Sequence, residues 1–380
     1  MNKKLLSLIC CAAMFTSTMY AADNSASNGA SAKAEEHSCQ SSILAKLPKL
    51  SGYLQTGFNY TYQNGKSTSS FQAKRLRLLM DGKVSENIDF RLQIEAFNGI
   101  AGSINRNDQK TIQVMDAFAT WKIMPEFKVR FGQFYTPLGY ENYDISPATL
   151  ETVDFSNIVY RMSCRNPYDY NFVDYGRDLG VMFMGDIGDS GKGFRYFHYD
   201  VALTNGSLPT ADDKNNYKDI YASFTVRPIK NLNFKATYNW GKYNTTNRGG
   251  GLGVPGGNDN TMHRFVAGGW YNDPKGLDIR SEFGLVKSKV GSTVFVDEIG
   301  AYVFAGYHLG KFLPMVRWDM YKDTVHNALA AANYNRILVG LTYELCKNVK
   351  FQLNYGHFFY SSTVPVKSME HVQLMGIFKF

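Results

Sequence analysis

Apolar and polar residues alternate one by one along most of this chain. Residues 88–95 are an example, in which Ile88, Phe90, Leu92 and Ile94 are separated by Asp89, Arg91, Gln93 and Glu95. Residues 232–240, 336–345 and 349–359 repeat the pattern. A period of two is that of a β-strand whose two faces meet different surroundings, and a helix cannot produce it. The pattern therefore predicts an all-β protein.

The links between these expected strands alternate between short and long. The short ones are residues 83–87, 124–126, 187–193, 228–231, 273–276, 309–311 and 347–348. The long ones are residues 64–70, 98–110, 137–176, 205–216, 244–260, 287–294, 323–334 and 361–368. Bacterial membrane barrels have short periplasmic turns and longer outer loops. The pattern therefore predicts a transmembrane antiparallel β-barrel of about 16 strands, with both chain ends on the periplasmic side.

The faces opposite the apolar ones carry charges, and this bears on what the barrel encloses. An unpaired charge is very costly in a dry interior, whereas a barrel of about 16 strands is wide enough to hold water. We therefore expect the charged faces to look into a wet lumen and the apolar faces to look at lipid. A mean hydropathy of −0.28 fits, because only every second residue faces lipid. A soluble all-β protein with two packed sheets is the alternative, and it leaves the alternating link lengths unexplained.

The beginning of the chain follows a different pattern. Residues 1–22 have the charged start, apolar stretch and small residues of a secretory signal peptide, which predicts export to the bacterial outer membrane. Residues 23–50 include a Ser/Ala/Asn/Gly-rich stretch and are interpreted as a flexible N-terminal segment. The barrel is expected over residues 51–380. The cysteines Cys10, Cys11, Cys39, Cys164 and Cys346 have neither disulfide-framework nor zinc-site spacing.

Six short motifs follow one another along the expected barrel. In residues 129–139, Gly132-Gln133-Phe134 precedes Pro137 and Gly139, and residues 176–181 read Gly-Arg-Asp-Leu-Gly-Val. The other four motifs occupy residues 116–122, 201–206, 314–321 and 373–380. In order and spacing they resemble the phosphate-selective porin O and P family of bacterial outer-membrane proteins. The resemblance covers residues 51–380.

This resemblance implies an outer-membrane porin that forms a homotrimer and lets phosphate or related small anions diffuse passively, without a cofactor. It also implies a ladder of arginines and some lysines along the pore, which the short motifs do not place residue by residue. The formal charge of +8 agrees with anionic solutes. Two alternatives remain open: a non-selective general porin, and an outer-membrane adhesin or structural barrel without transport.

The candidate pore-lining cations lie on the predicted inward faces, because guanidinium groups suit phosphate best. They are Arg75, Arg77, Arg91, Lys128, Arg130, Lys235, Arg264, Arg280, Arg317 and Arg336, together with Arg161 and Arg165 in the link 137–176. Arg75 and Arg77 are the sharpest candidates, since two like charges on one face need an anion or an acidic neighbour. Acidic residues share these faces, so pairing across strands is the second interpretation.

The link 137–176 is far longer than ordinary connections. By analogy with sixteen-stranded porins in general, we expect it to fold into the lumen as a constriction loop. Its acidic residues are Glu141, Asp144, Glu151 and Asp154, which are expected to oppose the basic wall and create a transverse field. The alternative is an external loop that caps the barrel or packs between subunits.

Enzymatic, metal and nucleic-acid functions receive little support from the sequence. The histidines are scattered and no nucleophile-elbow motif occurs, so neither catalytic nor metal-binding residues are predicted. Basic residues alternate with acidic ones in an exported chain, which disfavours nucleic acid as a partner. Expected partners are outer-membrane lipid, small anions and the outer-membrane assembly machinery, for which Phe378 and Phe380 are the expected terminal-strand signal.

Overall fold

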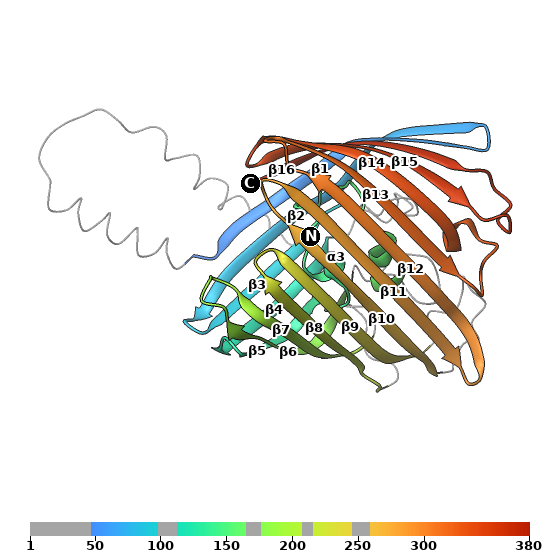
Figure 1. Ribbon diagram of the computed structural model, residues 1–380. Helices are drawn as coiled ribbons and strands as arrows, with labels where there is room; N and C mark the ends of the chain where they lie inside the picture. The colour runs from blue at the N-terminus through green and yellow to red at the C-terminus, as the bar shows by residue number, and fades with distance from the viewer. Residues whose placement is uncertain (1–46, 98–111, 165–175, 207–215, 245–258) are drawn as a thin grey trace, which may run out of the picture. The chain divides into compact units, whose positions relative to one another are not determined.

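Sixteen antiparallel strands close into a barrel in this computed structural model, which describes residues 47–97, 112–164, 176–206, 216–244 and 259–380. Each strand pairs with its neighbours in sequence, and β1 (Lys49–Gln63) closes the ring against β16 (Met369–Lys379) (Figure 1). The predicted fold class is confirmed. Internal contacts divide the chain after Leu47, and the barrel is the unit Pro48–Phe380. The predictions for residues 1–22 and for most of residues 23–50 lie outside the described residues.

The remaining strands follow in chain order around the ring. They are β2 (Lys66–Ser85), β3 (Ile88–Glu95), β4 (Gln113–Met124), β5 (Phe127–Tyr135), β6 (Arg177–Asp189), β7 (Arg195–Thr204), β8 (Asp219–Ile229), β9 (Leu232–Asn244), β10 (Asp259–Asn272), β11 (Leu277–Val290), β12 (Thr293–Tyr307), β13 (Phe312–Asp323), β14 (Asn333–Cys346) and β15 (Val349–Tyr360). A short 3₁₀ helix, η4 (Ala330–Ala332), precedes β14. No helix in the described ranges is long and apolar enough to cross a membrane.

Two of the expected long outer links are in fact tight turns. Residues 66–70 extend β2, so the β1–β2 hairpin turns at Asn64 and Gly65 alone, and β11 and β12 join through Gly291 and Ser292. Asn64 and Gly65 have φ values of 53° and 77°, as expected for an Asn-Gly turn between twisted antiparallel strands. The sequence interpretation missed this because the polar residues after Gly65 resemble a loop in composition. The links 347–348 and 361–368 lie where the sequence places them.

The two faces of the strands separate as the alternation predicts. Along β11, Leu277, Ile279, Phe283 and Leu285 are exposed on the outside, whereas Asp278, Arg280, Glu282 and Val286 are buried inside. Along β13, Val316 and Trp318 point outward, while Arg317 and Asp319 point inward. The outward set is the surface that meets lipid in a membrane barrel.

A β-bulge in β2 changes which residues of this strand face the barrel interior. Arg75 pairs with Gln55 but Ala73 pairs with Thr56, so Lys74 is an extra residue on the β2 side. The bulge turns Lys74 inward together with Arg75, and both side chains are buried. Strict alternation places Lys74 on the lipid face, which is why the sequence interpretation did not select it.

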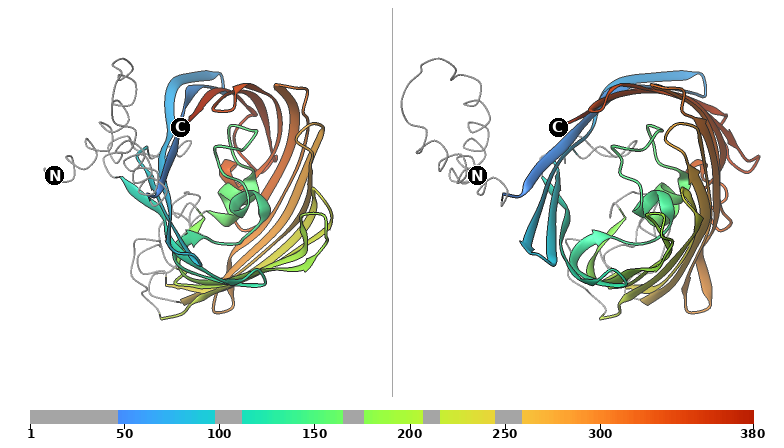
Figure 2. Two further views of the ribbon diagram at one scale, coloured as in Figure 1. Left: turned by 90° about the vertical axis from the view of Figure 1, so that its left-hand side faces the viewer. Right: turned by 60° about the vertical axis from the view of Figure 1, so that its left-hand side comes forward.

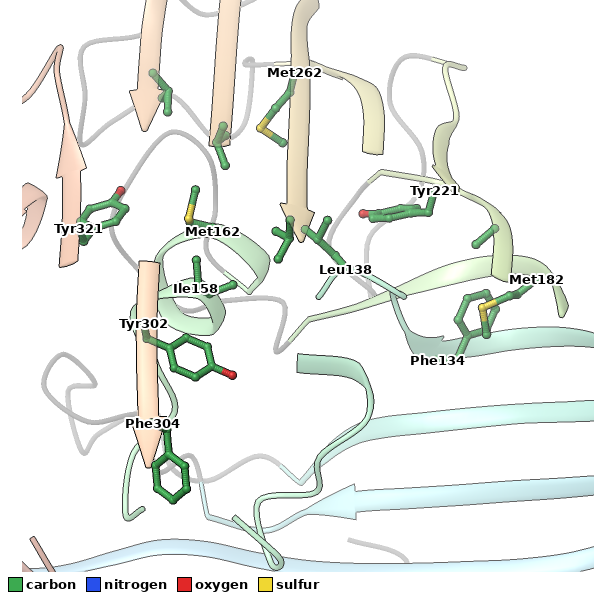
Figure 3. Packing of buried hydrophobic residues seen from close by; sticks show 14 of the residues in the cluster. Phe134, Leu138, Ile158, Met162, Met182, Tyr221, Met262, Tyr302, Phe304 and Tyr321 are labelled. Carbon is green, nitrogen blue, oxygen red and sulfur yellow. The ribbon is translucent and has the colours of Figure 1, made fainter. Parts of the chain in front are cut away.

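Part of the barrel interior is packed and dry, which corrects the expectation of a wet wall throughout. The link after β5 packs its apolar side chains against inward residues of β6 to β8 and β10 to β14, and Phe134, Leu138, Ile158, Met162 and Met182 belong to one buried cluster (Figure 3). Inward charges of β9 to β15 are covered by this link. The cations among them that are named below each have a hydrogen-bonding or ionic partner, which makes their burial tolerable.

Candidate functional site

The link between β5 and β6 folds into the barrel. Its described part, residues 136–164, contains α3 (Tyr140–Tyr143) and the π-helix η2 (Ile158–Ser163). Figure 2 shows this green segment inside the ring of strands. The infolding that the sequence predicts for this link is thus present in the structure, and the role of the segment as a constriction stays a prediction. We call residues 136–164 the infolded segment.

The first turn of the infolded segment is fixed by one wall carboxylate. Glu282 of β11 accepts hydrogen bonds from the backbone N–H groups of Tyr140 at 2.5 Å and Glu141 at 3.1 Å. These donors begin α3 and have no partner within the helix. The Tyr140 ring also stacks on Trp270 of β10 with 3.7 Å between ring centres.

A pair of glycines in the wall receives the π-helix. Gly284 of β11 lies opposite Gly300 of β12 in the strand pairing, and both face inward. A Cβ atom on Gly284 would lie 2.9 Å from the Met162 sulfur and 3.1 Å from Cδ1 of Ile158. A Cβ atom on Gly300 would lie 2.8 Å from the same sulfur. A Cβ atom at either position would force the Met162 or Ile158 side chain to move, so glycine at both positions accommodates the close approach of the helix.

The four acidic residues of the infolded segment pair with basic residues of the wall. Glu151 lies 2.7 Å from Arg280, Asp144 lies 2.7 Å from Lys235, Glu141 lies 3.7 Å from Arg317, and Asp154 pairs with Lys74. The prediction that these residues create a transverse field across an open channel is therefore wrong. The fields of two opposite charges in direct contact largely cancel at a distance.

The pKa values of these carboxyl groups depend on burial and on their partners. Burial raises the pKa of Asp154, but Lys74, His371 and Arg336 together outweigh it and hold that pKa well below its usual range. Burial likewise opposes ionisation of Glu151, yet Arg280 and Lys350 together with a backbone hydrogen bond lower its pKa overall. For Glu141, burial prevails over Arg317 and raises the pKa. Glu141 is therefore the least strongly ionised of the three.

Five of the predicted pore cations are buried under or beside the infolded segment. They are Lys235, Arg264, Arg280, Arg317 and Arg336. Arg317 and Arg336 share the carboxylate of Asp319, at 2.9 and 2.8 Å. Arg264 donates to Asn239 at 2.8 Å and to the Tyr221 hydroxyl at 3.0 Å. For these residues the second interpretation of the sequence, pairing within the wall, is the one that the structure supports.

Arg75 and Arg77 line a small cavity together with Arg177 of β6. Arg77 pairs with Glu95 at 2.8 Å and Arg177 with Asp116 at 2.6 Å, whereas Arg75 donates to the amide oxygen of Gln55 at 2.7 Å. The accessible volume of the cavity is about 10 Å³, enough for about one water molecule. The cavity is too small for a phosphate ion in this conformation. Arg177 is not among the pore-lining cations predicted from the sequence, although it belongs to the motif at residues 176–181.

Arg91 of β3 and Lys128 and Arg130 of β5 are only partly exposed. Arg91 forms a bidentate pair with Asp81 at 2.6 and 3.1 Å, and Lys128 pairs with Asp186 at 2.9 Å. Arg130 differs, because its Nε donates to the Thr120 hydroxyl at 3.1 Å and its guanidinium lies 4.2 Å from the centre of the Phe118 ring. Within the described ranges, no carboxylate lies within ion-pair distance of Arg130.

The remaining predicted residues lie at the edges of this arrangement. Arg161 of η2 is half-buried, with its guanidinium 5.9 Å from the Tyr334 ring centre, and Arg165 lies outside the described residues. Phe378 points outward on β16, and Phe380 exchanges two backbone hydrogen bonds of 3.0 Å with Gly52. Recognition of Phe378 and Phe380 by the outer-membrane assembly machinery stays a prediction.

Comparison with known proteins adds a family assignment. A family model described as phosphate-selective porin O and P matches residues 50–289. No curated protein matches the sequence.

Several solved structures share the fold at low sequence identity. The anion-selective porin from Comamonas acidovorans is 14% identical with a TM-score of 0.60, over 88% of this chain and 99% of that one. Pseudomonas putida OprB is 12% identical with a TM-score of 0.63, over 91% and 97%. OmpT of Vibrio cholerae in its trimer form is 13% identical with a TM-score of 0.54, over 88% and 99%. At such identities the likeness shows the fold alone.

Proposed function

The chain belongs to the phosphate-selective porin O and P family and is an outer-membrane porin, and on that premise we propose that it passes small anions, with phosphate as the leading candidate. The observation that supports anion preference is the uncompensated charge of Arg130. Most inward cations have a carboxylate partner, whereas Arg130 is partly exposed and, among the described residues, contacts Thr120 and Phe118 and has no carboxylate within ion-pair distance. A guanidinium in that state attracts anions to the wall beside it.

The solute path in this proposal follows the wall formed by β2 to β6, where Arg91, Lys128 and Arg130 are partly exposed. The paired residues Arg91 with Asp81 and Lys128 with Asp186 lie on that wall and are nearly neutral as pairs. Arg75 also has no carboxylate within ion-pair distance among the described residues, but it is buried and therefore acts on passing ions only from a distance. Arg130 is the residue that we expect to contact anions.

Recording in planar bilayers tests the proposal. We would measure the reversal potential of the purified protein across a KCl gradient and then titrate phosphate against the chloride current. Arg130→Gln is expected to reduce the anion preference severalfold. The matched control is the double variant Arg91→Gln with Asp81→Asn, which removes a charge pair at constant net charge and should leave the reversal potential unchanged.

The outcomes separate the candidate functions. Anion preference that falls in Arg130→Gln, with block of chloride current by phosphate, supports an anion channel that binds phosphate. Conductance without selectivity or block makes the protein a general porin and removes the role of Arg130. Complete lack of conductance in folded protein would favour a structural barrel or an adhesin.

A homotrimer is a further part of the proposal. It rests on family membership and on the fold shared with OmpT, whose structure is described as a trimer form. Native mass spectrometry of the protein in detergent should give a mass three times that of the chain. A mass equal to one chain would overturn this part and leave the channel proposal standing.

A further inference from the structure

The barrel is closed where β1 meets β16, and we call this pairing the seam. Tyr53 to Gln63 of β1 lie opposite Lys379 to Met369 of β16. In the described barrel, the other neighbouring strands follow one another directly in the chain, whereas the two seam strands belong to its opposite ends. β16, β1 and β2 lie side by side in Figure 1. Opening of the seam would expose two unpaired strand edges, which is costly in a membrane.

One carboxylate of the infolded segment contacts the strands on both sides of β1. Oδ1 of Asp154 pairs with the Lys74 ammonium group of β2, and Oδ2 accepts a hydrogen bond of 2.8 Å from the Gln373 amide of β16. All three side chains are buried. Lys74 faces the interior because of the bulge in β2, so this bulge supplies one half of the contact. Asp154 thus links the first hairpin of the barrel to its last strand.

Further contacts attach the infolded segment to the first hairpin. The side-chain amide of Gln55 on β1 donates to the carbonyl oxygen of Pro147 at 2.9 Å. The Lys74 ammonium group also donates to the carbonyl oxygen of Val153 at 2.8 Å. Gln55 is buried like Lys74, so both hydrogen bonds lie away from solvent. The segment is therefore held by β1 and β2 at two separate points along its path.

The same part of the segment is attached to the last two strands. Val153 packs against Met375 and Ile377 of β16 in a small buried cluster. Its backbone N–H donates to the side-chain oxygen of Asn354 on β15 at 2.9 Å. The amide of Gln352 on β15 donates to the carbonyl oxygen of Glu151 at 2.7 Å. Residues 147–154 therefore bridge the seam from inside the barrel.

We propose that residues 147–154 act as a clasp that keeps the seam closed, and we call them the clasp. Separation of β1 from β16 has to break the contacts of the clasp with one side, in addition to the backbone hydrogen bonds of the seam. Hydrogen bonds that involve an ionised group contribute more than neutral ones, and Asp154 makes one on each side. The clasp thus sets how often the seam opens locally, whichever solute the pore passes.

Hydrogen exchange of the full protein in lipid vesicles, measured by mass spectrometry, tests the clasp. Backbone amides of β1 and β16 report on the seam, and those of β10, which the ring order places far from it, report on the rest of the wall. Asp154→Asn should accelerate exchange at the seam at least about tenfold and change exchange in β10 by less than about twofold. Heat-modifiable mobility on electrophoresis checks that each variant forms a closed barrel.

Two further variants separate the clasp from general loosening. Gln373→Met removes the contact with β16 without leaving an unpaired charge, and should accelerate exchange at the seam about threefold or more. Asp144→Asn is the matched control, because it alters another carboxylate of the infolded segment that pairs with a buried lysine, Lys235 of β9. It should leave exchange at the seam within about twofold of that in the unaltered protein.

Three results would overturn the proposal. Unchanged exchange at the seam in both Asp154→Asn and Gln373→Met would mean that the clasp does not hold it. Equal acceleration at the seam and in β10 would mean a general loss of stability. Equal acceleration at the seam by Asp144→Asn would mean that any loosening of the infolded segment opens the barrel, without a special role for residues 147–154.

Discussion

The sulfur of Met162 packs against Gly284, so close that a Cβ atom at that glycine would lie 2.9 Å from it. This contact joins the π-helix of the infolded segment to the barrel wall, and Gly300 on the neighbouring strand completes the recess. The position of the segment in the lumen thus depends on the absence of two side chains. The same segment is held by ion pairs and by Glu282.

Filling the recess should displace the infolded segment and widen the path. We expect Gly284→Val to raise single-channel conductance and to lower the free energy of unfolding by about 1–3 kcal/mol, because the added atoms overlap Met162 and Ile158. Gly356→Val is the control, since a Cβ atom at that inward glycine meets nothing closer than 3.7 Å. Equal conductance in Gly284→Val and the unaltered protein would show that the recess does not position the segment.

Removing the carboxylate of Asp319 should be strongly destabilising. Asp319 is buried and accepts hydrogen bonds from Arg317, Arg336 and the backbone N–H of Asn157 in the infolded segment. Asp319→Ala leaves two buried guanidinium groups without their carboxylate partner. We therefore expect the free energy of unfolding, measured with urea in lipid vesicles, to fall by about 3–5 kcal/mol. Glu126→Ala removes the partly exposed pair with Arg195 and should cost less than about 1 kcal/mol. Similar losses in both variants would contradict this account.

The ion pair of Asp154 with Lys74 should persist in acid. The pKa of Asp154 is depressed, so its contribution to stability is present above the unfolded value of about 3.9 and is lost as pH falls through the lower folded value. The difference in unfolding free energy between the unaltered protein and Asp154→Asn should therefore stay constant from pH 7 to about 5 and shrink only below about pH 4. If this difference in unfolding free energy already shrinks between pH 7 and 5, Asp154 and Lys74 do not form the ion pair described here.

Glu141 should show the opposite dependence. Its pKa is raised by burial, so the folded state holds a proton more tightly than the unfolded state and gains stability as pH falls from neutral towards the unfolded value of about 4.3. Relative to Glu141→Gln, the unaltered protein should become more stable over that range. Unfolding of both proteins between pH 7 and 4.5 measures the difference, and a flat difference would mean that Arg317 keeps Glu141 fully ionised.

Period-two alternation predicted the strands and the inward face of Arg264, Arg280 and Arg317, and the alternating link lengths predicted the barrel. It failed at Lys74, because a β-bulge shifts the register and leaves no sign in hydrophobicity. It also missed the turn at Asn64, although the Asn-Gly pair carries a recognised hairpin signal. The infolding of the link after β5 was expected from its length and from analogy with sixteen-stranded porins.

The sequence by itself determined which face of each strand meets lipid, because side-chain direction follows the chain with a fixed period of two. Only the tertiary structure decided which charges remain uncompensated. Arg317 pairs with Glu141, and Arg280 with Glu151, from elements far apart in the chain, whereas Arg130 has no carboxylate within ion-pair distance in the part of the chain that the structure describes. Ion pairing depends on distances of a few ångströms between such elements, and these distances are set by closure of the barrel and by the path of the infolded segment.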